Sequence, residues 1–190
     1  MLKLSAPFIL ASASTRRKEL FSKITDEYEV IPSDVSEKVP KGISALKTAE
    51  YLARMKANDI ARKNPNKVVI GCDTVVINGR KIMGKPYDRE HAVEMLSALS
   101  GKTHLVITGV CIKYGDKTVS FSEKTRVTFR RITTEEIEDY ISSFEPFDKA
   151  GSYAVQGQGS LFVKRICGDY YNVVGLPVCK LYGELKKMLG

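Results

Sequence analysis

The sequence contains no tryptophan and only two histidines, His91 and His104. Its four cysteines lie far apart and form no Cys-x-x-Cys pair. A zinc site requires clustered Cys and His ligands, so this composition does not support one. Cysteines scattered through apolar segments are typical of buried, reduced thiols, and they favour a cytoplasmic protein.

No apolar run approaches the roughly 20 residues that a membrane-spanning helix needs. The apolar segment 7–11 lacks the basic region and the long apolar region of a signal peptide, so we interpret it as a buried strand. We therefore expect no membrane partner.

The chain also lacks any block of five or six like charges, although its net charge is +8. Basic proteins attract polyanions, which include nucleic acids, anionic membranes and free nucleotides. Because the charge is spread along the chain, it argues against a nucleic-acid partner. A free nucleotide and a solvated basic surface without a partner both remain open.

Length and patterning predict one α/β domain over residues 1–190, long enough to bury a core. Apolar runs predict strands over 8–11, 28–31, 67–77, 80–83, 104–114, 118–130 and 161–166. Helical patterns are expected from Ser14 or Thr15, over 44–63, after Asp88, after Thr133 and after Pro177. This order indicates a mixed sheet flanked by helices, with a cleft between two lobes.

Three local patterns give finer expectations. Asn78-Gly79 is typical of a type I′ hairpin turn. Thr133 and Glu136 form a capping box, before a helix expected to bury Ile137, Tyr140, Ile141 and Phe144. The helix over 44–63 is expected to bury Leu46, Ala49, Ala53, Ala57 and Ile60.

The first segment that looks chemical is Ser12-x-Ser14-x-Arg16-Arg17. Here a buried strand leads into a helix whose first turn carries two arginines, although cations oppose the helix dipole at that end. Backbone N–H groups and guanidinium groups together form a phosphate site. The alternative is that one or both arginines simply face solvent.

Asp73 interrupts the otherwise apolar strand 68–77. A carboxylate in such a strand must be paired, bind a metal or lie where the strand emerges into a cleft. It is therefore a candidate general base or Mg²⁺ ligand. A structural aspartate that caps a turn is an equally good explanation.

Three other charged residues have weaker claims from the sequence alone. Lys56 falls at the edge of the apolar stripe of its helix, where a lysine either extends to solvent or serves a site. Lys85, in Gly84-Lys85-Pro86, follows the return strand of the hairpin after Asp73 and can reach its neighbourhood. Glu37 lies in a polar loop, where a glutamate is usually solvated.

A glycine-rich segment follows at 148–159. Its glycines allow the backbone to approach a ligand, and Gln156 could hydrogen-bond the edge of a base. It is not a Gly-x-Gly-x-x-Gly fingerprint that opens a helix, which argues against a dinucleotide site.

These segments together resemble the Maf family over nearly the whole chain. The matching motifs, in order, are 10–17, 71–76, 84–86, 100–104 with 108–110, 148–153 with 156–157, and 168–177. The resemblance implies an elongated α/β fold like that of the inosine-triphosphate pyrophosphatases, with a deep cleft and a homodimer. It also implies hydrolysis of a nucleoside triphosphate between its α- and β-phosphates, with Mg²⁺ or Mn²⁺.

The resemblance further implies roles for individual residues. Asp73 would be the proton acceptor and, with Glu37, a metal ligand, while Lys85 would join it in catalysis. The residues implied to bind phosphate are Ser12, Arg16, Arg17 and Lys56, together with Lys85. The residues linked to substrate choice are Arg16, Thr74 and Gln156.

Gln156 is typical of the subgroup that acts on dTTP, UTP and modified uridine triphosphates, and it is missing from the subgroup that prefers 7-methyl-GTP. Two positions depart from the family pattern. Thr15 stands where proline is common, and Ser36 stands where an aspartate often precedes the glutamate, so Glu37 is the only carboxylate there.

The expected purpose of the protein is removal of non-standard nucleotides. The alternatives are a non-catalytic nucleotide-binding regulator of cell division and a nucleic-acid-binding module, which would need exposed aromatics along a basic stripe.

Overall fold

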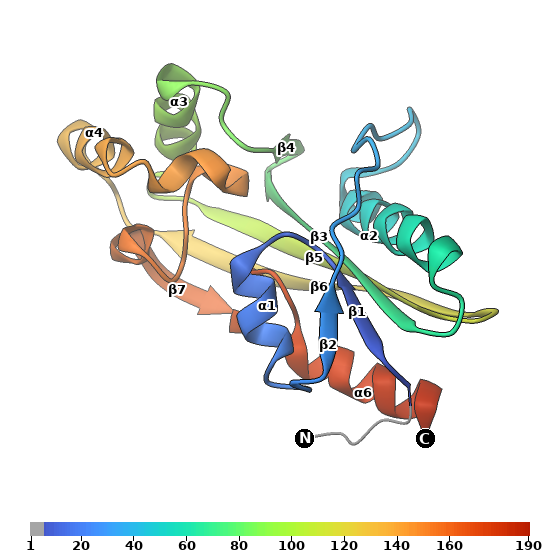
Figure 1. Cartoon of the computed structure of the whole chain (residues 1–190). Coiled ribbons are helices and arrows are strands. Elements are labelled where there is room, and N and C mark those ends of the chain that lie inside the picture. The colour runs from blue at the N-terminus through green and yellow to red at the C-terminus, as the bar shows by residue number, and fades with distance from the viewer. Residues whose placement is uncertain (1–5) are drawn as a thin grey trace. The chain divides into compact units, whose positions relative to one another are not determined.

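The computed structural model describes residues 6–190, which form a mixed α/β protein with one seven-stranded sheet (Figure 1). The strands are β1 (Phe8–Ala11), β2 (Tyr28–Val30), β3 (Val68–Asn78), β4 (Lys81–Met83), β5 (Thr103–Tyr114), β6 (Lys117–Phe129) and β7 (Val163–Cys167). The α-helices are α1 (Thr15–Phe21), α2 (Ala45–Lys63), α3 (Arg89–Leu99), α4 (Thr134–Ser142), α5 (Tyr170–Val174) and α6 (Val178–Leu189). Three 3₁₀ turns complete the chain: η1 (Glu145–Asp148), η2 (Ala150–Ser152) and η3 (Gln158–Phe162).

The strand order is β2-β1-β3-β5-β6-β7, and β4 pairs with β3 outside this path. β1 is parallel to β2 and β3, whereas β4 is antiparallel to β3 and β7 is antiparallel to β6. The expectation of a mixed sheet with helices is confirmed. Of the described residues, none belongs to a helix that is long and apolar enough to cross a membrane.

The residues group into two compact units. Unit 1 contains the chain up to Asp73, together with 108–123 and 175–190, and unit 2 contains 74–107 and 124–174. Strands β3, β5 and β6 each contribute residues to both units.

In unit 1, α2 packs against the sheet through small residues. A Cβ on Gly71 of β3 would lie 2.3 Å from the carbonyl oxygen of Ala53, and one on Gly109 of β5 would lie 2.3 Å from that of Ala49. The two glycines therefore let the helix backbone approach the strands far more closely than other side chains would. Leu46 was expected to be buried but is 44% exposed, because burial along α2 begins only at Thr48.

In unit 2, α3, α4 and the segment around Tyr153 share an apolar core. The rings of Phe129 and Tyr153 meet edge to face at 4.7 Å, and those of Tyr140 and Phe162 at 5.0 Å. Phe144 was expected in this core but is 79% exposed. Its backbone leaves the helix with a φ of 62°, in the left-handed region, and this turns the side chain outward.

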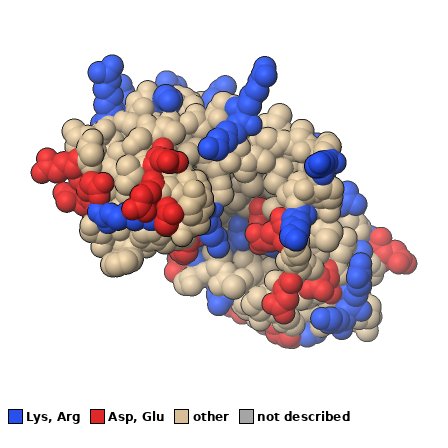
Figure 2. Space-filling view, turned by 90° about the horizontal axis from the view of Figure 1, so that it is seen from above, with Lys and Arg blue, Asp and Glu red and all other residues tan. Residues whose placement is uncertain are grey.

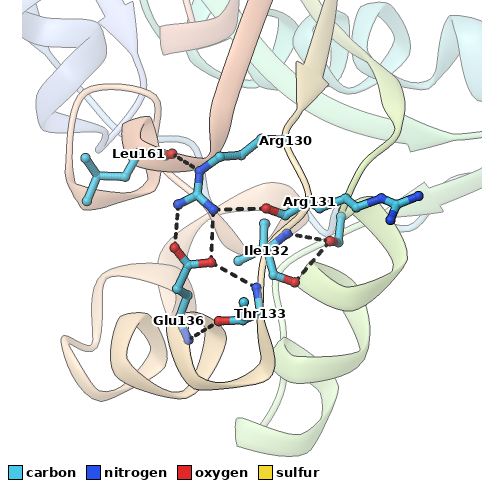
Figure 3. A network of polar contacts seen from close by, with 7 residues as sticks. Arg130, Arg131, Ile132, Thr133, Glu136 and Leu161 are labelled. Atoms are coloured by element: carbon cyan, nitrogen blue, oxygen red, sulfur yellow. Dashed lines mark hydrogen bonds and ion pairs between the residues drawn. The ribbon is translucent and has the colours of Figure 1, made fainter.

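The end of β6 is joined to α4 by a polar network (Figure 3). The predicted capping box is confirmed, since Thr133 Oγ1 accepts from Glu136 N and the Glu136 carboxylate accepts from Thr133 N. Arg130 donates to both oxygens of this carboxylate at 2.9 and 2.7 Å, and its Nε donates to the Leu161 carbonyl. These hydrogen bonds lower the pKa of Glu136 to about 2. The carboxylate therefore stays charged and keeps the strand, the helix and η3 together.

Two further expectations need correction. The β3–β4 loop is Gly79-Arg80, because Asn78 pairs with Lys81, and among residues 78–81 only Gly79 has a positive φ, 61°. This fits the first central position of a type II′ turn instead of the expected type I′ turn. The last strand begins at Val163 and not at 161, because η3 continues through Phe162.

All four cysteines lie within the described residues and are free thiols. Cys72 and Cys111 are buried as expected, but Cys167 and Cys179 are exposed. The two exposed cysteines lie on the edge strand β7 and on α6, where one face meets solvent.

Candidate active site

Asp73 and Lys56 form a buried ion pair in unit 1. Asp73, on β3, is 8% exposed, and Lys56, on α2, is 9% exposed. Lys56 Nζ donates to Asp73 Oδ1 at 2.7 Å and also lies 2.7 Å from Glu37 Oε1. The ammonium group of Lys56 therefore does not extend to solvent but lies between two carboxylates.

The close approach of α2 to β3 explains this pair. Gly71 lies two residues before Asp73, and the residues it touches, Ala53 and Ala57, flank Lys56 on the helix. Without a side chain at position 71, the helix comes near enough for the lysine to reach the carboxylate. The contact between Lys56 and Asp73 thus depends on a glycine–alanine interface that the sequence encodes.

Burial raises the pKa of Asp73 above its ordinary range, and it is the largest effect on this carboxyl group. The positive charges of Lys56 and Arg17 act in the opposite direction, while the negative charge of Glu37 raises the pKa further. A carboxylate whose affinity for a proton is increased in this way is a better general base than a solvated one. This environment is compatible with a general base at Asp73.

The segment after β1 brings hydroxyl and guanidinium groups to the same edge of the sheet. The parallel register pairs Ala11 with Gly71, so Ser12 follows β1 where Cys72 and Asp73 continue β3. Ligands of open α/β sheets bind outside the carboxyl ends of parallel strands. Ser12 is buried, which fits a position inside such a site and not on the solvated surface.

Arg17 is fixed in this segment by two hydrogen bonds. Its Nη1 donates to Ser12 Oγ at 3.1 Å, and its Nε donates to the Gly175 carbonyl at 2.9 Å. Arg16, beside it in α1, is half-buried. The alternative that one or both arginines simply face solvent does not hold for Arg17, which is anchored and lowers the pKa of Asp73.

Cys72, next to Asp73, is fully buried. Burial raises the pKa of its thiol to about 11, so the thiol is neutral near pH 7. A neutral buried thiol is a poor nucleophile, and Cys72 acts as a small apolar side chain beside the carboxylate.

The carboxylates of Glu37 and Asp73 provide the donor set for a hard cation. Both approach the same ammonium group at 2.7 Å, so they converge on one point. Mg²⁺ is commonly bound by one or two carboxylates together with substrate phosphates and water, and carboxylate oxygens are its preferred ligands. Within residues 6–190 no cluster of three or more His, Cys, Asp or Glu side chains forms an all-protein cage. The two carboxylates therefore fit a cation that arrives with a phosphate ligand.

Unit 2 holds the three remaining predicted residues, Thr74, Lys85 and Gln156. Their segments converge at Gly151, whose N–H donates to the Gly84 carbonyl at 2.9 Å. A Cβ on Gly151 would also lie 3.0 Å from the side chain of Val76 on β3, two residues after Thr74. Gly151 thus brings together three backbone segments: the one that carries Thr74, the one that carries Lys85, and the one that leads to Gln156.

The buried ring of His104 pairs through Nε2 with the hydroxyl of Tyr153 at 2.8 Å. Burial lowers the pKa of His104 to about 4, so the ring is neutral near pH 7. The bond connects the start of β5 to the glycine-rich segment and leaves His104 with a structural role. Glu145 belongs to no motif of the sequence, but its carboxylate accepts hydrogen bonds from the backbone at Gln158 and Gly159, beside Gln156.

The family model described as "Maf-like protein" matches residues 7–188. The chain belongs to the Maf-like family. Among curated relatives of this Maf-like chain, a "dTTP/UTP pyrophosphatase" of Bacillus cereus (strain ATCC 14579) is 50% identical over 179 residues, which cover 94% of each chain. A protein of the same description from Bacillus anthracis (strain CDC 684) is also 50% identical, with the same coverage.

Among solved structures, the Maf-like chain resembles two Ham1 proteins. That of Staphylococcus aureus has a TM-score of 0.55 and 17% identity, and the match covers 96% of this chain and 99% of the other. That of Coxiella burnetii has a TM-score of 0.54 and 13% identity, with the same coverage. At these identities the likeness concerns the fold, and it supports the expected α/β class.

Proposed function

We propose that this Maf-like chain is a nucleoside-triphosphate pyrophosphatase that hydrolyses dTTP or UTP to the monophosphate and pyrophosphate. The observation that carries the proposal is a buried carboxylate, Asp73, held by Lys56 at 2.7 Å and within the field of Arg17. A protein that only binds nucleotides has no need of a carboxylate beside the phosphates, because the negative charge of the carboxylate repels them. The curated relatives described as dTTP/UTP pyrophosphatases support the same conclusion.

Asp73 is the general base of the proposed reaction. It orients a water molecule and removes its proton as the water attacks the α-phosphorus, and pyrophosphate then leaves. The raised pKa of the carboxyl group favours this proton transfer near neutral pH.

The cationic side chains bind the phosphates and neutralise the charge of the leaving pyrophosphate. Arg17 and Lys56 already act on the charge of Asp73, and Arg16 and Lys85 are the other two cations assigned to the phosphates. Guanidinium groups bind phosphate oxygens in pairs, whereas lysine acts as a point charge. In this proposal the ammonium of Lys56 exchanges one of its two carboxylate partners for phosphate oxygens, and Ser12 supplies a hydroxyl.

Glu37 and Asp73 would hold the divalent cation, Mg²⁺ or Mn²⁺. When bound, this ion would neutralise charge on phosphate oxygens in the way typical of phosphoryl-transfer enzymes. The position of Lys56 between the two carboxylates keeps them close together before the ion arrives.

Base selection is assigned to Arg16, Thr74 and Gln156. A glutamine amide both donates and accepts a hydrogen bond, so it can pair with the O4 and N3–H groups of thymine or uracil. The same pairing would admit modified uridine triphosphates, which fits a role in removing non-standard nucleotides from the pool.

We propose that residues 1–190 act as one Maf-like domain and form a cytoplasmic homodimer without a nucleic-acid or membrane partner. On the face drawn in Figure 2, basic side chains are scattered among acidic and uncharged ones instead of forming a stripe. The four cationic side chains assigned to the phosphates account for part of the net charge of +8. Size-exclusion chromatography with light scattering tests the dimer, and a gel shift at low salt tests the absence of nucleic-acid binding.

The decisive experiment incubates the purified protein with dTTP, UTP, CTP, GTP and 7-methyl-GTP and with Mg²⁺ or Mn²⁺. Ion-exchange chromatography then separates the products. We expect monophosphate and pyrophosphate from dTTP or UTP, with turnover lowered by about 10²–10⁴-fold in Asp73→Asn. The matched control is Asp116→Asn, since Asp116 is exposed in the β5–β6 turn.

The other outcomes discriminate between the alternatives. Activity confined to 7-methyl-GTP would retain the enzyme class and contradict the assignment of Gln156. Nucleotide binding without any turnover would favour the non-catalytic regulator. An Asp73→Asn variant that kept more than about a tenth of the wild-type rate would exclude Asp73 as the base.

A further inference from the structure

The loop that carries Gln156 is held from beneath by buried groups. Gln156 itself is exposed, whereas Tyr153, Ala154 and Gly159 on either side are buried. The tip of the loop is therefore accessible to a ligand while both ends are fixed in unit 2.

A single carboxylate fixes the C-terminal end of the loop. Glu145 Oε2 accepts from Gln158 N at 3.0 Å, and Glu145 Oε1 accepts from Gly159 N at 3.2 Å. Glu145 Oε1 also accepts from the hydroxyl of Tyr140 at 2.8 Å. Hydrogen bonds to a charged acceptor are stronger than neutral ones, so this carboxylate dominates the local conformation.

Tyr140 extends the same support to the other end of the loop. Its hydroxyl oxygen accepts from Ala154 N at 3.1 Å while its hydroxyl hydrogen is donated to Glu145. The backbone is therefore bound on both sides of Gln156, at Ala154 and at Gln158. The described contacts connect these points through one tyrosine and one glutamate.

The glycines of the loop are required by this arrangement. A Cβ on Gly157 would lie 2.0 Å from Glu145 Oε2, and a Cβ on Gly159 would lie 2.8 Å from both the Tyr140 hydroxyl and the Ala154 carbonyl. Both positions thus press the backbone directly onto the supporting groups. This explains the Gly-x-Gly spacing without a phosphate-binding role.

We infer that Glu145, through Tyr140 and the Gln158 and Gly159 amides, is a positioning residue that orients Gln156 toward the substrate base. The inference rests on the proposed function, in which Gln156 contacts the base. Rotation about its last side-chain bond lets a glutamine amide offer its donor and its acceptor in either order, and uracil and cytosine present opposite patterns at positions 3 and 4. A loop held in one conformation restricts which order the amide offers, and a loosened loop does not.

The test compares kcat/KM for UTP with that for CTP in wild-type protein and in Glu145→Gln. The amide nitrogen of the new side chain cannot accept a hydrogen bond, so at least one of the three donors loses its partner. We expect the UTP-to-CTP ratio to fall by about tenfold, the equivalent of one neutral hydrogen bond to the base. Tyr140→Phe removes the hydroxyl alone and should lower the ratio in the same direction.

Two controls separate positioning from general weakening of the unit. Glu136→Gln makes the same chemical change in another glutamate of unit 2 that binds a backbone amide, Thr133 N, and it should leave the ratio unchanged (Figure 3). In a Gln156→Ala background, Glu145→Gln should cause no further change in the ratio, because the residue through which it acts is gone. Hydrogen exchange at Gln158 N and Gly159 N should accelerate in Glu145→Gln in either background.

The outcomes distinguish this inference from the proposed function. Active wild-type protein with an unchanged ratio in Glu145→Gln would overturn the inference alone, especially if the two amides exchange faster. An equal fall of the ratio in Glu136→Gln would also overturn it. Wild-type protein that hydrolyses no nucleotide would contradict the proposed function. UTP and CTP binding by the same variants, measured by calorimetry, would then decide the inference by the same ratio.

Discussion

Replacement of Gly71 by alanine tests the link between packing and chemistry most directly. A Cβ at this position would lie 2.3 Å from the Ala53 carbonyl oxygen, 2.7 Å from Ala57 N and 2.9 Å from Ala57 Cβ. Ordinary van der Waals contact begins at 3.4 Å. The obstructing atoms are mostly helix backbone, which cannot rotate away as a flexible side chain would.

The size of the effect follows from these distances. To relieve the contact, α2 has to move away from β3 by about 1 Å, the difference between 2.3 and 3.4 Å. Overpacking of this kind costs about 1–3 kcal/mol of unfolding free energy, and rigid backbone contacts place it near the upper end. The same shift draws Lys56 away from Asp73, and misplacement by about 1 Å can lower the rate of an enzyme by about 100-fold.

The measurements are the urea unfolding free energy and kcat/KM for dTTP. The matched control is Gly183→Ala in α6, also in unit 1, where an added Cβ meets nothing within 4 Å. Because alanine is the better helix former, the control should gain about 0.5–1 kcal/mol of stability and retain wild-type turnover. A Gly71→Ala protein with the stability and activity of the wild type would refute the proposed dependence of the site on this close contact.

Three further predictions concern charge and capping. Lys56→Met leaves the buried Asp73 carboxylate without its ammonium partner, so the unfolding free energy at pH 7 should fall by about 3–5 kcal/mol. The acidic limb of the plot of kcat/KM against pH should also move to higher pH, because the lysine lowers the pKa of Asp73. His104 has a lowered pKa of about 4 in the folded protein against an ordinary 6.5, so its neutral form beside Tyr153 contributes stability that is complete above pH 6.5 and is lost as the pH falls through 4. We expect the loss of unfolding free energy between pH 7 and pH 4, measured by urea titration, to be smaller in His104→Gln than in the wild type by an amount on the order of 3 kcal/mol. An equal loss in both proteins would contradict this assignment. Thr133→Ala removes the cap of α4 and should cost about 1 kcal/mol in urea unfolding with no change in kcat; a lowered kcat would show that α4 affects the chemistry.

Local sequence patterns, such as helix caps and the spacing of apolar residues, predicted much of the fold. The cap at Asp88 and the capping box at Thr133 lie within four residues of the groups they bind, so the sequence alone was sufficient to locate both helix starts. The buried face of α2 followed from helical spacing, except in its first turn. Phe144 could not be placed, because its exposure depends on a left-handed backbone conformation that no neighbouring residue dictates.

The candidate site was only partly predictable from the residues themselves. Asp73 stood out as a charge in an apolar strand, and Lys56 as a charge at the edge of an apolar stripe. Neither pattern specifies the other, since their contact joins residues 17 positions apart through the packing of α2 on β3. Glu145 gave no such indication, because its role arises from backbone amides 13 and 14 residues later in the chain.

Strand β3 has a consequence for how such proteins can be altered. Asp73 is the last residue of unit 1 in this strand, and Thr74 is the first residue of unit 2. One peptide bond therefore joins the residue assigned to hydrolysis to a residue assigned to base choice. Laboratory recombination between relatives could exchange 74–107 and 124–174 as two cassettes. Three of the four junctions would lie inside β3, β5 and β6, where strand register keeps the ends aligned, and the fourth would follow the end of α5. Such chimeras would take Asp73 and Arg16 from one parent and Thr74, Lys85 and Gln156 from the other. They would therefore separate the proposed general base from two of the three residues proposed to select the nucleotide.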